Sequence, residues 1–463
     1  MIALVILALL GVFLMMSGVL GIGRKSAGVV ATLGIGAALL ANTLMWDKDV
    51  TALNDMFNKM MLVDNYGLAM VGVILASAFG LFLLSDKYFS SITNYFTEHY
   101  ALYIFALVGM VCMVMYNNLS MLFIGIEIMS VSLYILAGSN KTNLASNEAS
   151  LKYFLMGSFA TGILLMGIAL IYGATGSFYL SGIESHFVNN PDTNNVIALV
   201  GMFLLLIGMA FKVSVAPFHF WAPDVYEGSP TFVTAFMSTA VKVAGFASFY
   251  KLMYICFTPN ILYWEYVIWG MIALTITVGS ITALIQTGMK RLLAYSSVSH
   301  AGYMLITILT ANEDSDLLFY TAAYVIASLL AFGVLFLVID AKGNDKVESF
   351  NGLSKSNPFL AFALTVAMAS MAGLPLTAGF FAKFYVLTAA VKDGYIYLVL
   401  IAIVNAMVGI YYYFKVVIAM FFKEESSETV SISVSPFYKL VLASGILATI
   451  VLGVYPDLVY NLI

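Results

Sequence analysis

Residues 197–221, IALVGMFLLLIGMAFKVSVAPFHFW, place Lys212 inside a long apolar run that is followed five residues later by Pro217. A run of about 20 apolar residues is long enough to cross the hydrocarbon core of a bilayer as a helix. A charged side chain at the centre of such a helix costs roughly 2.5–3.5 kcal/mol on insertion scales. Ionisable groups inside membrane segments commonly mark ion or proton pathways, so this stretch predicts a membrane fold with a transport function.

Further ionisable residues lie inside other apolar runs. Lys242 stands in TFVTAFMSTAVKVAGFASFY, Lys383 in GLPLTAGFFAKFYVL and Glu127 in SMLFIGIEIMSVSLYILAG. His300 follows Lys290 by ten residues, which is about 15 Å along a helix. We therefore expect a row of ionisable groups that crosses the protein at mid-depth.

The composition fits an integral membrane protein with almost no aqueous domain. Of 463 residues, 62% are hydrophobic and 10% are charged, whereas charged residues make up about a quarter of a soluble domain. The mean hydropathy is +0.98. We predict an all-α polytopic protein with about fourteen transmembrane helices, over residues 2–23, 27–46, 66–86, 100–116, 119–138, 150–173, 195–222, 231–256, 262–286, 291–311, 317–340, 358–391, 395–422 and 436–460.

Basic residues predict the orientation, because short cytoplasmic loops collect Lys and Arg. The loops that follow odd-numbered spans hold twelve basic residues: Arg24, Lys25, Lys87, Lys141, Lys152, Lys290, Arg291, Lys342, Lys346, Lys355, Lys423 and Lys439. The loops on the opposite membrane face hold only four: Lys48, Lys59, Lys251 and Lys392. This asymmetry predicts an even number of spans, both termini outside, and an N-terminal stretch that is a first span and not a cleaved signal peptide.

Several functional classes find no support in the sequence. Cys112 and Cys256 both fall inside predicted spans, and two cysteines cannot build an iron–sulfur or zinc site. No basic patch indicates nucleic acid, and no dinucleotide fingerprint or hydrolytic triad is present. GIGRKSAG at residues 21–28 follows a membrane span and lacks the spacing of a phosphate-binding loop. We therefore expect no cofactor and no metal in this chain, with any linked redox chemistry in another chain.

Two spans carry signals that interrupt a helix. Pro217 follows Lys212 in the seventh span, and Gly373-Leu374-Pro375 precedes Lys383 in the twelfth. Proline removes a backbone donor and clashes with the preceding turn, and broken helices at corresponding positions indicate an internal repeat in transporters. We predict an N-terminal three-helix segment (1–99), two inverted five-helix repeats (100–256 and 257–422) with broken helices 7 and 12, and a C-terminal helix (423–463).

Each ionisable residue also has a structural interpretation. Desolvation favours the neutral form of a lysine and a nearby carboxylate favours the charged form, so Glu127 and Lys212 are able to act as a switch; the alternative is a static buried ion pair. Lys242 either carries protons or snorkels. Lys383 either carries protons or caps loose carbonyls at the helix break, and His300 is either a proton relay or a satisfied core residue.

The strings LFIGIEIMSVSLYIL, EASLKYFLMGSFATGILLMGIALIYG, FKVSVAPFHFWAPDVYEGSPT, VKVAGF, KRLLAYSSVSHAGY and GLPLTAGFFAKFYVL occur in this order from about residue 115 to 390. In these strings the chain resembles the antiporter-like proton-pumping membrane subunits of bacterial respiratory complex I (NADH:quinone oxidoreductase). A lysine at position 383, together with an end soon after the last span, resembles the subunit N type within that family.

The resemblance implies fourteen helices, an inverted pair of five-helix units, and proton translocation driven by quinone reduction elsewhere in the complex. It implies that Glu127 and Lys212 form a coupled pair, that Lys242 is a central relay and that Lys383 belongs to the exit half-channel. His300 and Lys290 also match positions of the family, and the resemblance implies a less defined part in proton transfer for them. Lys152 matches a position that implies a place at the cytoplasmic entry of the pathway.

The leading hypothesis is a proton-translocating membrane-arm subunit in a bacterial plasma membrane. Its expected partners are other membrane-arm subunits, including antiporter-like paralogues, and lipids, while flavin, iron–sulfur clusters and quinone belong to partner subunits. One alternative is a subunit of a multi-subunit sodium/proton antiporter. A second alternative is a non-transporting scaffold that joins neighbouring membrane subunits.

Overall fold

The computed structural model describes residues 1–21, 23–46, 48, 50–85, 88–89, 95–189, 195–310, 314–424 and 432–462. Lys87, one of the residues used to predict the orientation, lies outside this set. Every named element in the described part of the chain is a helix, and pairing between extended residues is limited to isolated bridges such as Met61 with Tyr116. The predicted all-α class is therefore confirmed.

The N-terminal half of the chain forms helices that are mostly long and apolar. They are α1 (Ile2–Ser17), α2 (Arg24–Thr43), α3 (Thr51–Asp55), α4 (Asn65–Leu83), α6 (Phe96–Met115), α7 (Leu119–Ala137), α8 (Leu144–Thr175), α9 (Leu180–Asn189), α10 (Val196–Lys212), α11 (Trp221–Gly228), α12 (Thr231–Phe236), the π-helical turn η1 (Met237–Val241), α13 (Lys242–Lys251) and a second π-helical turn, η2 (Leu252–Cys256).

The C-terminal half continues in the same way. Its elements are η3 (Thr258–Asn260), α14 (Ile261–Leu284), α15 (Met289–Thr310), α16 (Asp314–Lys342), η4 (Val347–Phe350), α17 (Leu353–Ser356), α18 (Pro358–Ala372), α19 (Ala378–Lys392), α20 (Ile396–Phe422), α21 (Pro436–Val454) and α22 (Asp457–Tyr460).

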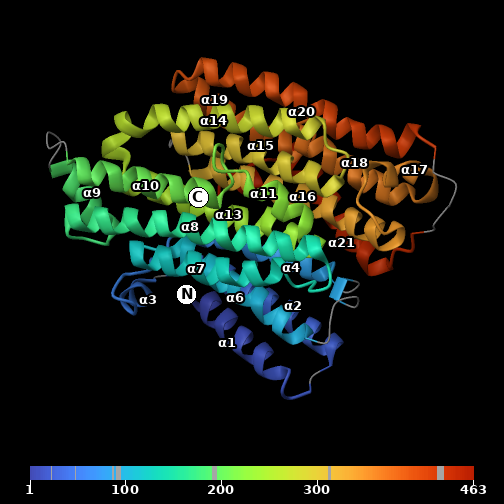
Figure 1. The fold of residues 1–463 in the computed structure, drawn as a ribbon, viewed down its shortest axis with the longest axis horizontal. Helices are drawn as coiled ribbons and strands as arrows, with labels where there is room; N and C mark the ends of the chain where they lie inside the picture. Colours follow the sequence, from blue (N-terminus) through green and yellow to red (C-terminus); the bar gives the residue numbers. More distant parts are fainter. Residues whose placement is uncertain are drawn as a thin grey trace.

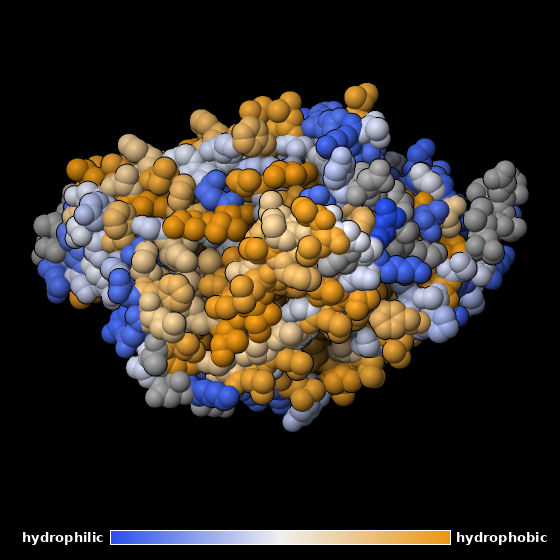
Figure 2. Space-filling view, turned by 90° about the horizontal axis from the view of Figure 1, so that it is seen from below, coloured by the Kyte–Doolittle hydropathy of each residue, from blue (hydrophilic) through white to orange (hydrophobic). Residues whose placement is uncertain are grey.

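The long helices lie side by side and run roughly along the longest axis of the molecule (Figure 1). Eleven helices in the described residues are long and apolar enough to cross a membrane, and Ile2–Ser17, Val196–Lys212 and Pro358–Ala372 are shorter apolar helices. Hydrophobic side chains cover a broad central part of the face in Figure 2, and hydrophilic ones gather toward its two ends. The chain is therefore a polytopic membrane protein.

Local sequence explains where several of these helices begin. A side chain that accepts a hydrogen bond from a backbone N–H of the first turn satisfies a donor that the helix leaves open. Residues of this kind start α4, α7, α8, α10, α18 and α21, namely Asp64, Asn118, Asn143, Asn195, Asn357 and Ser435.

The helix interruptions fall where the sequence predicts them. α10 ends at Lys212, Ser214 has a φ of 56°, and helix resumes at α11. α18 ends at Ala372, Gly373 has a φ of 85°, and α19 starts at Ala378. The predicted spans 195–222 and 358–391 are therefore broken helices, as expected, because proline and left-handed residues end the hydrogen-bond ladder.

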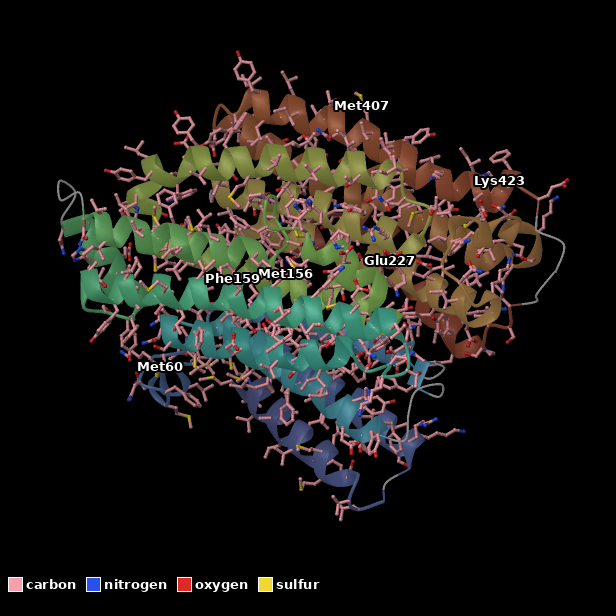
Figure 3. The ribbon with its side chains drawn as sticks, in the orientation of Figure 1. Met60, Met156, Phe159, Glu227, Met407 and Lys423 are labelled. Atoms are coloured by element: carbon pink, nitrogen blue, oxygen red, sulfur yellow. The ribbon has the colours of Figure 1, made fainter. Side chains whose placement is uncertain are left out.

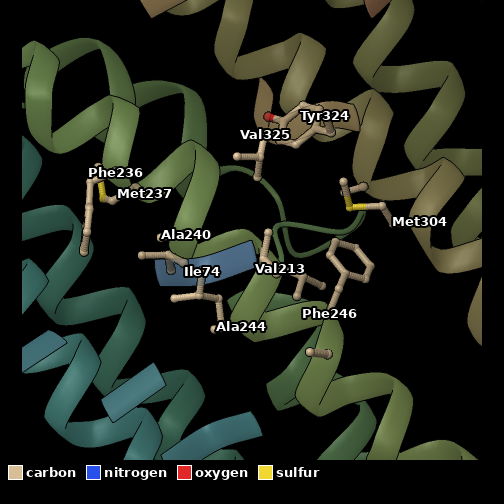
Figure 4. Packing of buried hydrophobic residues seen from close by; sticks show 14 of the residues in the cluster. Ile74, Val213, Phe236, Met237, Ala240, Ala244, Phe246, Met304, Tyr324 and Val325 are labelled. Atoms are coloured by element: carbon tan, nitrogen blue, oxygen red, sulfur yellow. The ribbon is translucent and has the colours of Figure 1, made fainter. Parts of the chain in front are cut away.

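The π-helical turns and the short helices α3 and α9 have no counterpart among the predicted spans. η1 lies directly before Lys242, and π turns inside helices are frequent at functional sites. Its surroundings are closely packed: Figure 4 shows Met237 and Ala240 of this turn among Ile74, Val213 and Ala244. All the residues of η1 are buried, so tertiary packing surrounds this irregular turn.

Candidate functional site

Lys212 is the last residue of α10, and its ammonium group points toward α7. The side chain is only 8% exposed, and Nζ donates to the hydroxyl of Ser130 on α7 at 3.0 Å. Glu127, one turn earlier on α7, is half-buried. Its Oε1 is buried without a hydrogen-bond partner, and among the described residues no hydrogen bond or ion pair joins this carboxylate to the lysine.

Glu127 and Lys212 nevertheless interact electrostatically. Ser130, three residues after Glu127, lies on the same side of α7 because residues three apart are neighbours on a helix surface. The arrangement is therefore that of a separated pair, in which the hydroxyl of Ser130 holds the lysine and one carboxylate oxygen stays open. A small movement of either side chain would change the charge balance at this position.

Lys242 follows the π-helical turn η1 and is 3% exposed. Its Nζ donates to the hydroxyl and the carbonyl of Ser297 on α15, at 2.5 and 2.7 Å, and to the hydroxyl of Ser214 at 3.3 Å. Ser214 lies in the interruption that begins after Lys212. Lys242 therefore links the break of the α10–α11 segment to α15, and its burial and contacts exclude snorkelling to the surface.

His300 lies one turn after Ser297 on α15 and is 6% exposed. Its Nδ1 contacts the hydroxyl of Tyr320 on α16 at 2.8 Å, and its Nε2 contacts that of Tyr413 on α20 at 3.1 Å. A tyrosine hydroxyl both donates and accepts. Both ring nitrogens therefore have partners that are able to pass a proton in either direction, and His300 interacts electrostatically with both Lys242 and Lys383.

Lys383 is 9% exposed on α19 and reaches across the second interruption. Its Nζ donates to the carbonyls of Met371 and Ala372, both at 3.0 Å, and lies 5.1 Å from the ring centre of Tyr303. These carbonyls end α18 and lack the partners that a continuing helix would supply. Lys383 therefore binds loose carbonyls at the helix break, and its buried ammonium group lies beside Tyr303 of α15 at the same time.

A small cavity lies beside His300 and reaches Met371 and Ala382, next to Lys383. It measures about 10 Å³ and is lined by residues of α15, α16, α18 and α19, among them His300, Tyr320, Ser370 and Met371. A space of about this size is the least that holds one water molecule, which also needs polar partners. The lining residues supply a ring nitrogen and hydroxyl groups.

Lys152 and Lys290 do not join this row. Lys152 Nζ lies 2.9 Å from Asp224 and 2.8 Å from Glu148. Lys290 Nζ donates to the backbone carbonyls of Glu227 and Ser229 at 2.5 and 2.7 Å. The two lysines therefore belong to a separate charged cluster around α11.

The charge count places Lys251 in an outer loop, but the structure places it at the buried end of a helix. It is 3% exposed at the end of α13, and its Nζ lies 3.5 Å from a carboxylate oxygen of Asp64. A buried ammonium group near a carboxylate does not report which side of a membrane a loop occupies.

The contacts between the ionisable residues come mostly from hydroxyl groups that the sequence did not single out, in Ser130, Ser214, Ser297, Tyr320 and Tyr413. Isolated Ser and Tyr residues in apolar helices carry no charge signal. Among the described residues, no group of three or more His, Cys, Asp or Glu side chains is arranged to hold a metal ion.

Comparison with known sequences gives consistent results. Residues 116–409 match the family described as NADH:quinone oxidoreductase/Mrp antiporter, TM. The chain is 43% identical to NADH-quinone oxidoreductase subunit N of Cytophaga hutchinsonii, over 99% of each chain. It is 41% identical to the subunit N of Trichlorobacter lovleyi, over 98% of this chain and 94% of the other.

Solved structures agree. A chain of respiratory complex I from Thermus thermophilus with bound aureothin is similar with a TM-score of 0.84 and 31% identity, over 99% of this chain and 98% of that chain. A chain of the Mrp complex from Dietzia shares the fold, with a TM-score of 0.84 at 20% identity over 99% of this chain and 94% of that chain. On its sequence relatives and its fold together, this chain belongs to the NADH:quinone oxidoreductase/Mrp antiporter membrane-subunit family, among the relatives named NADH-quinone oxidoreductase subunit N.

Proposed function

We propose that this chain translocates protons as a membrane-arm subunit of a respiratory NADH:quinone oxidoreductase. Protons would pass along the buried residues Glu127, Lys212, Lys242, His300 and Lys383. The observation that supports this proposal is that buried lysines and His300 bind hydroxyl groups or free carbonyls near the two helix interruptions, and that His300 lines a small cavity.

The connection is supported step by step. Ser130, three residues after Glu127 on α7, accepts a hydrogen bond from Lys212. Ser214, two residues after Lys212, accepts one from Lys242. Ser297 then lies one turn from His300 on α15. The cavity beside His300 is lined by Met371, whose carbonyl accepts from Lys383. Ionisable groups held inside a bundle of membrane helices are expected of proton relays, because their burial is costly without a function.

The topology that goes with this function has fourteen membrane crossings, counting the three shorter apolar helices and treating α18 and α19 as one broken crossing. It comprises a three-helix segment over 1–99, inverted repeats over 100–256 and 257–422, and a last helix over 423–463. Two matched helix contacts support the repeat. A Cβ on Gly109 of α6 would lie 2.6 Å from a backbone atom of α7, and one on Gly279 of α14 would lie 2.5 Å from a backbone atom of α15.

In this topology both termini lie on the outer side of a bacterial plasma membrane. The partners are other membrane-arm subunits, including antiporter-like paralogues, and lipids. Flavin, iron–sulfur clusters and quinone belong to other subunits, so redox energy reaches this chain as a change in electrostatics or helix packing at Glu127 and Lys212. Lys152 and Lys290 lie outside the pathway and have a different role.

Two alternative functions, an antiporter subunit and a non-transporting scaffold, are less well supported by these observations. A subunit of an Mrp-type sodium/proton antiporter shares the fold, but the relative at 43% identity is named as a subunit of the oxidoreductase. A non-transporting scaffold has no need for buried lysines, whose insertion into a membrane helix is costly.

The test uses the assembled complex in liposomes, with proton uptake measured per electron transferred from NADH to quinone. Lys212→Ala and Lys383→Ala should lower the ratio of protons to electrons while the complex stays assembled. Lys415→Ala is the matched control, since Lys415 Nζ binds the carbonyl of Gln286 away from the row. An unchanged ratio in both alanine variants would establish the scaffold instead, and a sodium requirement would favour the antiporter.

A further inference from the structure

The charged cluster around α11 holds both ends of that short helix. Asp224, in its first turn, uses both carboxylate oxygens: Oδ2 lies 2.9 Å from Lys152 Nζ on α8, and Oδ1 lies 3.3 Å from Arg291 Nη2 on α15. Glu227, labelled in Figure 3, lies 2.5 Å from Nη1 of the same arginine. α11 is thereby fixed between α8 and α15, the helix that carries Ser297 and His300.

Lys290 strengthens the same attachment at the C-terminal end of α11. Its ammonium group donates to the carbonyls of Glu227 and Ser229, which lie at the end of that helix. A cation is favoured there, because the last carbonyls of a helix carry partial negative charge and lack partners. Two cations on α15 and one on α8 therefore surround one eight-residue helix.

The N-terminal end of α11 contacts the turn that bears Lys212. Trp221 Nε1 donates to the carbonyl of Phe211 at 3.0 Å, and Phe211 immediately precedes Lys212. The Trp221 ring also stacks on Tyr153 of α8, with ring centres 4.7 Å apart and planes 7° apart. A displacement of α11 would therefore move the last turn of α10 and change the position of the Lys212 ammonium group relative to Ser130 and Glu127.

We propose that Asp224 is a positioning residue for proton transfer. It fixes α11 between Lys152 and Arg291, and α11, through Trp221, sets where the turn bearing Lys212 lies. Lys152 and Lys290 then act as anchors and do not carry protons. The inference rests on the proposed function, because it takes Lys212 as a proton-carrying residue.

The experiment compares three variants of the assembled complex in liposomes, Asp224→Asn, Trp221→Phe and Glu148→Gln. Asp224→Asn removes the charge that pairs with α8 and α15. Trp221→Phe keeps a ring at the stack and removes only the N–H that holds the Phe211 carbonyl. Glu148→Gln is the control, since Glu148 pairs with Lys152 on its own helix, with a 65% exposed side chain, and no ion pair joins it to α11 among the described residues.

We expect Asp224→Asn and Trp221→Phe to lower the proton-to-electron ratio and to displace the pH profile of pumping by about half a unit. Asp224→Glu should restore both. Glu148→Gln should match the unchanged complex. Because Trp221→Phe leaves every charge in place, its effect separates positioning from a direct electrostatic influence of Asp224.

The positioning role is overturned if Asp224→Asn pumps like Glu148→Gln, or if Asp224→Asn is impaired while Trp221→Phe pumps normally. Should Asp224→Asn fail to assemble, Trp221→Phe alone decides. Failure of the proposed function gives a different result. In that case Lys212→Ala leaves the proton-to-electron ratio unchanged, whatever the effect of the variants in α11.

Discussion

At the scale of single residues, the structure explains how a buried lysine is tolerated. Among the described residues no carboxylate contacts Lys212, and its ammonium group donates to the hydroxyl of Ser130 at 3.0 Å. Lys242 and Lys383 likewise bind serine hydroxyls or backbone carbonyls. Neutral oxygens stabilise the charged form without the fixed charge of a permanent ion pair, which is what the proposed release of a proton by each lysine requires.

This dependence gives a prediction for Ser130→Ala. The variant leaves the Lys212 ammonium group without its hydroxyl partner, and an unsatisfied buried polar group costs about 1–3 kcal/mol. We expect proton pumping by the assembled complex to fall about fivefold or more, measured as the initial rate of proton uptake into liposomes.

Ser132→Ala on the same helix is the control, because the Ser132 hydroxyl donates to the carbonyl of Ile128 in its own helix at 2.9 Å. That variant should pump normally. Equal rates for the two alanine variants would show that Ser130 does not support Lys212.

The comparison of Ser130 with Ser132 shows which residues of the site the sequence is able to predict. Glu127, Lys212, Lys242 and Lys383 are recognisable because charges are rare in apolar segments. Ser130 and Ser132 look alike in the sequence, yet only Ser130 contacts a lysine. The difference comes from how α7 is rotated against α10, which is set by tertiary packing and leaves no local signal.

At the scale of elements, a serine hydroxyl at the first interruption accepts from Lys242, and two free carbonyls at the second interruption accept from Lys383. Pro217 and Gly373-Leu374-Pro375 located both interruptions correctly, because the backbone chemistry of proline and glycine acts locally. The sequence did not predict the separate helix α11 or the π-helical turn η1. Their lengths depend on contacts with distant residues, such as the ion pairs of Asp224.

The second interruption depends on a close approach of α18 and α19, which leads to a prediction for Gly379→Ala. A Cβ at this position would lie 1.8 Å from the carbonyl oxygen of Ser370, so the two helices would have to separate. Overpacking of this kind costs about 1–3 kcal/mol. We expect the variant to unfold at a lower temperature and to pump less, because Lys383 on α19 would move away from the carbonyls that end α18.

The matched control is Gly162→Ala on α8, where a Cβ meets no other atom within 4 Å. Its thermal unfolding, followed with Gly379→Ala in the same detergent, should be unchanged. A normal unfolding temperature and normal pumping in Gly379→Ala would contradict the tight α18–α19 contact.

At the scale of the whole molecule, the predicted topology places the basic residues unevenly on the two membrane faces. It assigns most of the lysines and arginines to the short loops of one face, which is the pattern expected of the cytoplasmic side. Lys251 is a poor reporter within this count, since its side chain is 3% exposed and its ammonium group lies 3.5 Å from a carboxylate oxygen of Asp64. The orientation is therefore better tested at exposed positions that flank one crossing.

Lys392 and Lys423 are such positions, because both are exposed and only α20 and short connections separate them. The 27 residues of α20 span about 40 Å, enough to place the two lysines on opposite membrane faces. Figure 3 shows Lys423 at the end of this helix. The native Cys112 and Cys256 are 4% and 0% exposed, so they should give little background with a thiol reagent.

We predict that a membrane-impermeant maleimide labels Lys392→Cys, and not Lys423→Cys, when added to cells whose plasma membrane is intact and accessible. Inverted membrane vesicles should give the opposite pattern, because the cytoplasmic face is then outermost. Both cysteines should react after detergent solubilisation, which controls for burial by neighbouring subunits. Labelling of Lys423→Cys from the outside would reverse the orientation, and the direction of proton transfer through Lys212 and Lys383 would have to be reversed with it.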